Sequence, residues 1–256
     1  MGTIEFERAG SVATIWLNRP AARNALCAAM LDELGSVVAA LEVDESTRVA
    51  VIRGRGTAFS AGADLAELAA ATVEQASEAA RGWSTTLNRL AALPVPLIAA
   101  MHGFALGGGF LMALYCDLRL VAEGTRLGLP PASTLWIPPW ALSRLAAWVG
   151  TARAEQFLLT AGVIDASEAL ASCLADRVVP SESFDAVVAD TAARLSHAKR
   201  SVVAEVRRFF AQLRGSRHED WDQTSTAGFL RCLASADVQE ALGALRERFG
   251  NRTPSA

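Results

Sequence analysis

Two glycine-bearing segments, residues 59–65 and 103–111, constrain the fold most strongly, because each joins an apolar strand-like run to a helix-like run. Glycine permits a sharp backbone turn and lets a ligand approach bare N–H groups. Two such turns, each at the start of a helix, can direct two amide donors at one oxygen atom. That arrangement is typical of an oxyanion hole, which stabilises negative charge on a carbonyl oxygen.

The N-terminal half alternates strand-like and helix-like segments. The predicted strands are residues 4–8, 12–17, 49–52, 97–101 and 118–122, and the predicted helices are 25–41, a segment from 63 onward, 76–92 and 108–115. Residues 9–10 join the first two strands as an antiparallel hairpin. The remaining alternation implies right-handed β-α-β crossovers and a mostly parallel, buried sheet, so the predicted fold class is α/β.

The chain changes character after Pro138 and becomes predominantly helical. The predicted helices are residues 141–149, 152–159, 165–171, 184–195, 201–213, 221–233 and 238–249. In this part only residues 176–179 indicate a further strand. We therefore expect a sheet-based N-terminal part followed by a helical C-terminal region.

Composition narrows the class of protein. Of the 256 residues, 52% are hydrophobic and 20% charged, which is typical of a soluble globular chain with ample core. The net charge of −3 gives no overall attraction to nucleic acid. The longest apolar runs are too short to span a bilayer, and no signal peptide is evident. Four widely spaced cysteines favour reduced thiols, so we expect a cytoplasmic protein without a membrane span.

Four motifs together resemble the crotonase family, the enoyl-CoA hydratase/isomerase superfamily. The first is Leu-Asn-Arg-Pro at 17–20 followed by Asn-Ala-Leu at 24–26. The two glycine segments are similar to the first and second oxyanion segments of the family. Residues 235–240 are similar to its closing pattern of serine, aspartate and glutamate. The similarity covers almost the whole chain.

The resemblance implies a core of repeated β-β-α units over residues 1–195 and a helical region, 196–256, that builds homotrimers, often paired into hexamers. It implies an acyl-CoA thioester as ligand, with coenzyme A as part of the substrate, no separate cofactor and no metal. The thioester oxygen would accept hydrogen bonds from the amides of Ala63 and Gly108.

The resemblance also places the rest of the ligand. Adenine would lie near Ala61, Asp64, Leu65 and Ala66, with Arg23 beside a phosphate. Trp136 and Trp140 flank the expected acyl pocket, either as an apolar wall for the acyl chain or as ordinary packing residues. For the first glycine segment, the alternative is an ordinary strand-to-helix turn capped by Asp64. For the second, a dinucleotide loop is disfavoured because GxGxxG is absent.

The sequence departs from the family at the catalytic positions. Hydratases of the family carry two glutamates, and the corresponding positions here are Leu111 and Pro131. Residues 110–142 look more like mitochondrial-type Δ3,Δ2-enoyl-CoA isomerases, although their single glutamate also corresponds to Pro131. Glu67, one helical turn from Ala63, is a candidate replacement base. Two hypotheses remain: an isomerase-like enzyme that stabilises a thioester enolate, and a non-catalytic acyl-CoA binder.

Overall fold

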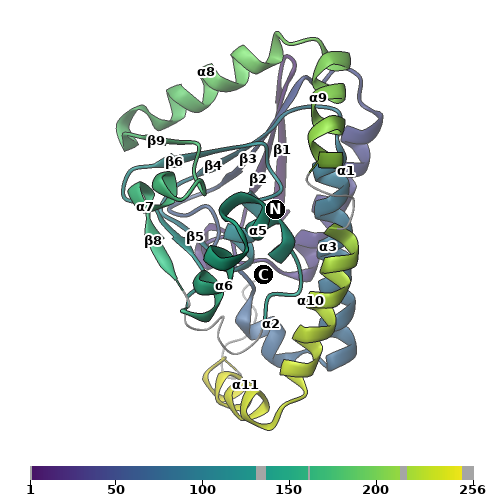
Figure 1. Cartoon of the computed structure of the whole chain (residues 1–256), viewed down its shortest axis with the longest axis vertical. Coiled ribbons are helices and arrows are strands. Elements are labelled where there is room, and N and C mark those ends of the chain that lie inside the picture. Colours follow the sequence, from purple (N-terminus) through teal and green to yellow (C-terminus); the bar gives the residue numbers. More distant parts are fainter. Residues whose placement is uncertain (1, 131–136, 161, 214–217, 250–256) are drawn as a thin grey trace.

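The computed structural model describes residues 2–130, 137–160, 162–213 and 218–249, and its main sheet confirms the α/β class. Six strands form this sheet in the order β1-β2-β3-β4-β6-β9 (Figure 1). Their bounds are Ile4–Ala9, Val12–Leu17, Val49–Gly54, Leu97–Met101, Leu118–Ala122 and Arg177–Val179. β1 and β2 form the predicted antiparallel hairpin, with Ile4 opposite Leu17, and the other neighbours pair in parallel.

Helices cover both faces of the sheet, which explains why β4 is buried along its whole length. The helices before the C-terminal region are α1 (Ala28–Val43), α2 (Leu65–Ala70), α3 (Val73–Ala92), α4 (Gly108–Ala113), α5 (Leu142–Val149), α6 (Thr151–Leu159), α7 (Ala166–Ala171) and α8 (Phe184–Ser196). α8 packs on one face through Phe184 and Val188, against Val51 and Ile98. The larger core lies on the other face, where α1 contacts α3.

A second, three-stranded sheet was not predicted. Its order is β5-β7-β8, with bounds Phe104–Leu106, Arg126–Gly128 and Val163–Asp165. The expectation that 176–179 is the one strand after Pro138 is therefore wrong, because β8 also lies there. Each of these strands has only three residues, too few to show an alternating pattern. They form because distant segments pair with each other.

The C-terminal helices are α9 (Arg200–Leu213), α10 (His218–Leu233) and α11 (Ala236–Phe249). α10 runs along α3, and α11 contacts α2 (Figure 1). A small hydrophobic core, separate from the other two, joins α3, α10 and α11. In it, Phe229 and Leu233 pack near Ala76 and Ala80 of α3. Within the described ranges, no helix has the length and apolarity needed to cross a membrane. The C-terminal region thus packs directly beside the helices that follow the first glycine turn.

Candidate functional site

The two glycine turns meet backbone to backbone. Ser60 pairs with Ala105 in a parallel bridge: the Ser60 amide donates to the Phe104 carbonyl (3.0 Å), and the Leu106 amide donates to the Ser60 carbonyl (2.9 Å). Gly62 has φ +92°, and a Cβ added there would lie 2.7 Å from the Leu106 carbonyl oxygen. Only glycine tolerates both that conformation and that close approach. The two segments, more than forty residues apart in sequence, therefore form one structure.

The amides of Ala63 and Gly108 remain available at this junction. Leu26 pairs with Ala63 in a parallel bridge, in which the Leu26 amide donates to the Gly62 carbonyl and the Asp64 amide donates to the Leu26 carbonyl. The bridge therefore uses groups of the residues on either side of Ala63, and the Ala63 amide has no partner among the described residues. Gly108 is the first residue of α4, and the first amides of a helix have no intrahelical acceptor. The Gly108 nitrogen would lie 3.3 Å from a Cβ at Gly62. Ala63 is exposed and Gly108 half-buried.

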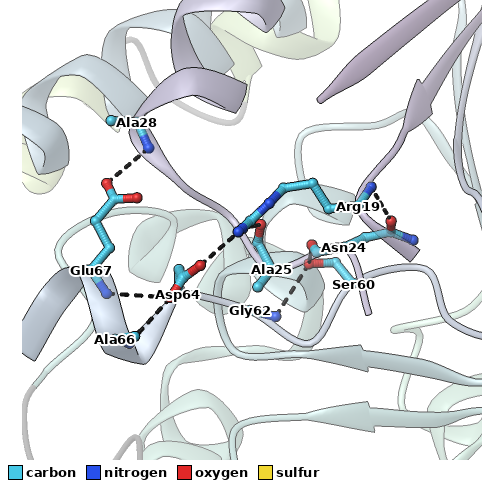
Figure 2. A network of polar contacts seen from close by, with 9 residues as sticks. All are labelled: Arg19, Asn24, Ala25, Ala28, Ser60, Gly62, Asp64, Ala66 and Glu67. Carbon is cyan, nitrogen blue, oxygen red and sulfur yellow. Dashed lines mark hydrogen bonds and ion pairs between the residues drawn. The ribbon is translucent and has the colours of Figure 1, made fainter. Parts of the chain in front are cut away.

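A buried asparagine holds the first turn in place (Figure 2). Asn24, at φ +55°, accepts from the Arg19 amide (2.8 Å) and donates to the carbonyl of Ala58 (2.7 Å). Its own carbonyl accepts from the Ser60 hydroxyl (2.8 Å), and that hydroxyl accepts from the Gly62 amide (3.2 Å). The Asn-Ala-Leu motif is thus a scaffold for the glycine turn.

Asp64 caps α2. Its Oδ1 accepts from the amides of Ala66 (3.1 Å) and Glu67 (3.3 Å), while Oδ2 forms an ion pair with Arg19 (2.9 Å), as Figure 2 shows. The Asp64 cap, which the sequence offered as the alternative explanation of the first glycine segment, is therefore present. These contacts engage both oxygens of the carboxylate in holding the turn.

Glu67 reaches the start of α1. Its Oε1 accepts from the amide of Ala28 at 2.9 Å, where an anion is also stabilised by the helix dipole (Figure 2). No described contact of Glu67 joins it to Gly108. Its role as a base stays a prediction.

The other predicted ligand contacts surround the first turn. Arg23 is exposed, and its carbonyl accepts from the Ala61 amide at 2.8 Å, so its backbone adjoins the predicted adenine site. Leu65 and Ala66 form the first turn of α2, with Leu65 half-buried and Ala66 exposed. These positions are compatible with the predicted contacts, which stay predictions.

Apolar side chains surround the second turn. A Cβ at Gly108 would lie 2.9 Å from Leu26 Cδ1 and 3.5 Å from Cζ2 and Cη2 of Trp140. Trp140 is 5% exposed, and Leu111 on α4 is 2% exposed. Pro131 and Trp136 lie outside the described residues. Of the predicted site residues, the structure thus brings Ala63, Gly108 and Trp140 to one junction.

Sequence reasoning missed a buried polar cluster beside this wall. Asp222 of α10 is 3% exposed and accepts from the hydroxyl of Tyr115 at 3.2 Å. Burial raises the pKa of Tyr115, and the charge of Asp222 raises it further, so the phenol stays protonated. Burial likewise raises the pKa of Cys116 to about 12. Asp222 stands in a polar stretch of sequence, and nothing there distinguishes it from the exposed Asp220.

Comparisons with known proteins identify the family. The family model described as enoyl-CoA hydratase/isomerase matches residues 7–251. A probable enoyl-CoA hydratase of Mycobacterium bovis is 37% identical over 200 residues, which is 78% of this chain and 77% of that protein. A crotonyl-CoA hydratase of Syntrophomonas wolfei is 32% identical over 250 residues, 96% of this chain and 95% of that protein.

Solved structures show the same fold. The crystal structure of an enoyl-CoA hydratase/carnithine racemase from Magnetospirillum magneticum superposes with a TM-score of 0.80 and 32% identity, over 97% of this chain and 94% of that one. An enoyl-CoA hydratase from Mycobacterium avium subsp. paratuberculosis gives a TM-score of 0.86 with 26% identity, over 95% and 98%. Both similarities extend over nearly the whole chain, including the C-terminal helices.

Proposed function

Because this chain belongs to the enoyl-CoA hydratase/isomerase family, we propose that it binds an acyl-CoA thioester with the carbonyl oxygen at the amides of Ala63 and Gly108. The observation that carries the proposal is the junction of the two glycine turns, where neither residue is fully buried and both amides lack a described acceptor. Amides fixed in advance need no reorganisation when charge develops on the oxygen, and each such donor is worth about 10²–10³ in rate.

The proposed chemistry is isomerisation of a double bond through a thioester enolate, in preference to hydration. Removal of the α-proton of a 3-enoyl-CoA by a base places negative charge on the carbonyl oxygen, where the two amides stabilise it. Return of the proton to the γ-carbon then gives the 2-enoyl-CoA. Hydration additionally requires a group that activates water. Leu111 is apolar and buried, which supports isomerisation. The names of the relatives make hydration the competing candidate, and Glu67 is the first residue to test as base.

Two assays test the reaction. We expect purified protein to shift the double bond of a 3-enoyl-CoA measurably and to hydrate crotonyl-CoA very slowly. Hydration on the order of 10 s⁻¹, an ordinary enzyme turnover, would contradict the preference for isomerisation. Acyl-CoA binding without either reaction would support the non-catalytic binder.

Binding itself is tested by Gly108→Val, because the added side chain meets Leu26 and Trp140. We expect calorimetry with butyryl-CoA to show at least about tenfold weaker binding, since about 1.4 kcal/mol of crowding suffices for that change. Gly243→Val, at a glycine with open space around it, is the matched control. Undiminished affinity in a folded Gly108 variant would contradict the site.

The missing acid/base group suggests a gain-of-function test at Pro131. Pro131→Glu should raise double-bond isomerisation above the wild-type rate, and Pro131→Gln should not, because glutamine keeps the shape but cannot act as a base. Equal activity in all three proteins would show that catalysis uses a different residue.

We further propose that the protein is a homotrimer. One face of α9 presents Val202, Val206, Phe209 and Phe210, each at least 46% exposed, and exposed apolar faces of this kind mark interaction surfaces. Light scattering should give three times the chain mass, and Phe209→Glu should reduce it. A monomeric wild type would contradict the proposal. The pairing of trimers into hexamers, the cytoplasmic location and the lack of a separate cofactor stay predictions.

A further inference from the structure

Trp140 forms the wall of the acyl site next to Gly108. Its indole is held on two sides by other rings: Trp83 of α3, stacked with centroids 6.4 Å apart, and Tyr115, edge-on at 6.3 Å. Such ring contacts prefer certain orientations, but each is worth only about 0.5–1.5 kcal/mol beyond the area it buries, so two of them do not fix the indole by themselves. The position of the indole therefore depends on what fixes the backbone beneath it.

Helix α10 fixes the backbone on both sides of this tryptophan. Before it, the carbonyl of Pro139 accepts from the hydroxyls of Ser225 (2.7 Å) and Thr226 (2.9 Å). After it, the amide of Ala141 donates to Oδ1 of Asp222 (3.0 Å). Ala141 has φ +68°, a conformation that a residue with a Cβ seldom adopts without support. All three side chains come from two turns of one helix and are almost fully buried.

Asp222 also joins Ala141 to the neighbouring elements. Its Oδ2 accepts from the hydroxyl of Ser84 (2.7 Å), the side-chain amide of Asn88 (3.3 Å) and the hydroxyl of Tyr115 (3.2 Å). One carboxylate thus joins α3, the end of the α4 segment and the start of α5. A buried carboxylate with several donors is held in one geometry, because losing any partner leaves an uncompensated charge.

We propose that Asp222 is a positioning residue that sets the acyl-chain preference of the site by holding Trp140 against Gly108. The inference rests on the proposed function, since it specifies which acyl groups that site accepts. Helix α10 supplies this carboxylate. It acts through the backbone of Pro139 and Ala141, and so determines how much room remains beside the second glycine turn.

The test measures chain-length preference rather than affinity alone. Calorimetry gives the dissociation constants of butyryl-CoA and octanoyl-CoA for wild type, Asp222→Ala and Asp222→Asn. Without the carboxylate, Trp140 can move away from Gly108, and octanoyl-CoA should then bind more tightly relative to butyryl-CoA. In Asp222→Ala we expect the ratio of the two dissociation constants to change by about tenfold in favour of octanoyl-CoA. A change of this size corresponds to the discrimination that an apolar pocket makes on roughly one methylene group.

Two further proteins make the result specific. Asp222→Asn keeps an acceptor for the Ala141 amide and should restore most of the wild-type ratio, which a general loss of packing would not produce. Asp220→Asn, at an exposed position on the same helix, is the matched control and should leave the ratio unchanged. An unchanged ratio in folded Asp222→Ala would overturn the inference.

A second route applies if Asp222→Ala does not fold. The double variant Ser225→Ala with Thr226→Val removes the bonds to the Pro139 carbonyl and the Ser225 bond to the Asp222 backbone carbonyl but keeps the Asp222 carboxylate, and we expect it to shift the ratio in the same direction by a smaller factor. A folded double variant with the wild-type ratio would overturn the inference. Failure of the wild type to bind either acyl-CoA would instead contradict the proposed function.

Discussion

The two sides of the candidate site are built in different ways. The glycine turns around Ala63 and Gly108 meet through backbone bonds, such as the Leu106 amide to the Ser60 carbonyl at 2.9 Å, and the side chains of Asn24 and Ser60 hold the first turn. The wall at Trp140 is held by side chains of α10, some eighty residues further along the chain. The proposed charge-stabilising part of this site therefore depends on the two glycine turns and the backbone bonds between them. The proposed acyl-selecting part depends instead on the packing of the C-terminal region.

The largest loss of stability is expected from a substitution in the glycine turns. Gly62→Ala should lower the free energy of unfolding by about 4 kcal/mol, because backbone strain at positive φ adds to a clash with the Leu106 carbonyl. Urea denaturation measures the change. Gly124→Ala is the matched control, since Gly124 also has positive φ (+77°) but open space around it, and should cost only the strain. Equal losses of unfolding free energy in the two variants would show that the contact between Gly62 and the Leu106 carbonyl does not matter.

A somewhat smaller loss is expected on the second side. Asp222→Ala should lower the free energy of unfolding by about 3 kcal/mol, because it leaves four described donors without their acceptor in a buried place. Thermal and urea unfolding measure the loss, with Asp220→Ala as the exposed control. If Asp222→Ala lost no more unfolding free energy than Asp220→Ala, the packing of α10 would not depend on the Asp222 carboxylate.

The cap of α2 gives a smaller effect. Asp64→Ala should cost about 1 kcal/mol of unfolding free energy, as expected when an N-terminal cap is lost. Asp64→Asn keeps the cap but loses the ion pair with Arg19, and should recover most of the stability. If asparagine were no better than alanine, the ion pair rather than the cap would be the main contribution of Asp64.

The smallest effect is expected at Glu67. Glu67→Gln should change the isomerisation rate less than about threefold, because the carboxylate is held by the Ala28 amide and glutamine can keep that bond. Steady-state kinetics on a 3-enoyl-CoA measures it. A loss of about 100-fold or more, the usual contribution of a general base, would instead identify Glu67 as that base.

Sequence predicted the main sheet closely because most of its strands are five or six residues long and are either largely apolar or alternating. Residues 97–101 and 118–122 coincide with β4 and β6, and the hairpin coincides with β1 and β2 within one residue. The second sheet escaped because three-residue strands carry no periodicity, and their pairing comes from segments far apart in the chain.

The same difference separates the two sides of the site. Glycines reveal a turn by their chemistry, so the turns that carry Ala63 and Gly108 can be located from the sequence alone. Asp222 looks like any surface carboxylate in sequence, and its burial follows only from the packing of α10 on α3. Asp64 and Glu67 lie beside the first turn simply because they follow it in the chain. Which partners their carboxylates take depends on Arg19 and Ala28, which sequence does not show to be adjacent.

The most direct measurement of the central proposal is the infrared spectrum of a bound acyl-CoA labelled with ¹³C at the thioester carbonyl. Hydrogen bonds from the amides of Ala63 and Gly108 would draw charge to the oxygen and weaken the C=O bond. We therefore predict a carbonyl band at lower wavenumber in the complex than in water, and a smaller shift in Gly108→Val. A band at its solution position in the fully bound wild-type complex would contradict the oxyanion hole.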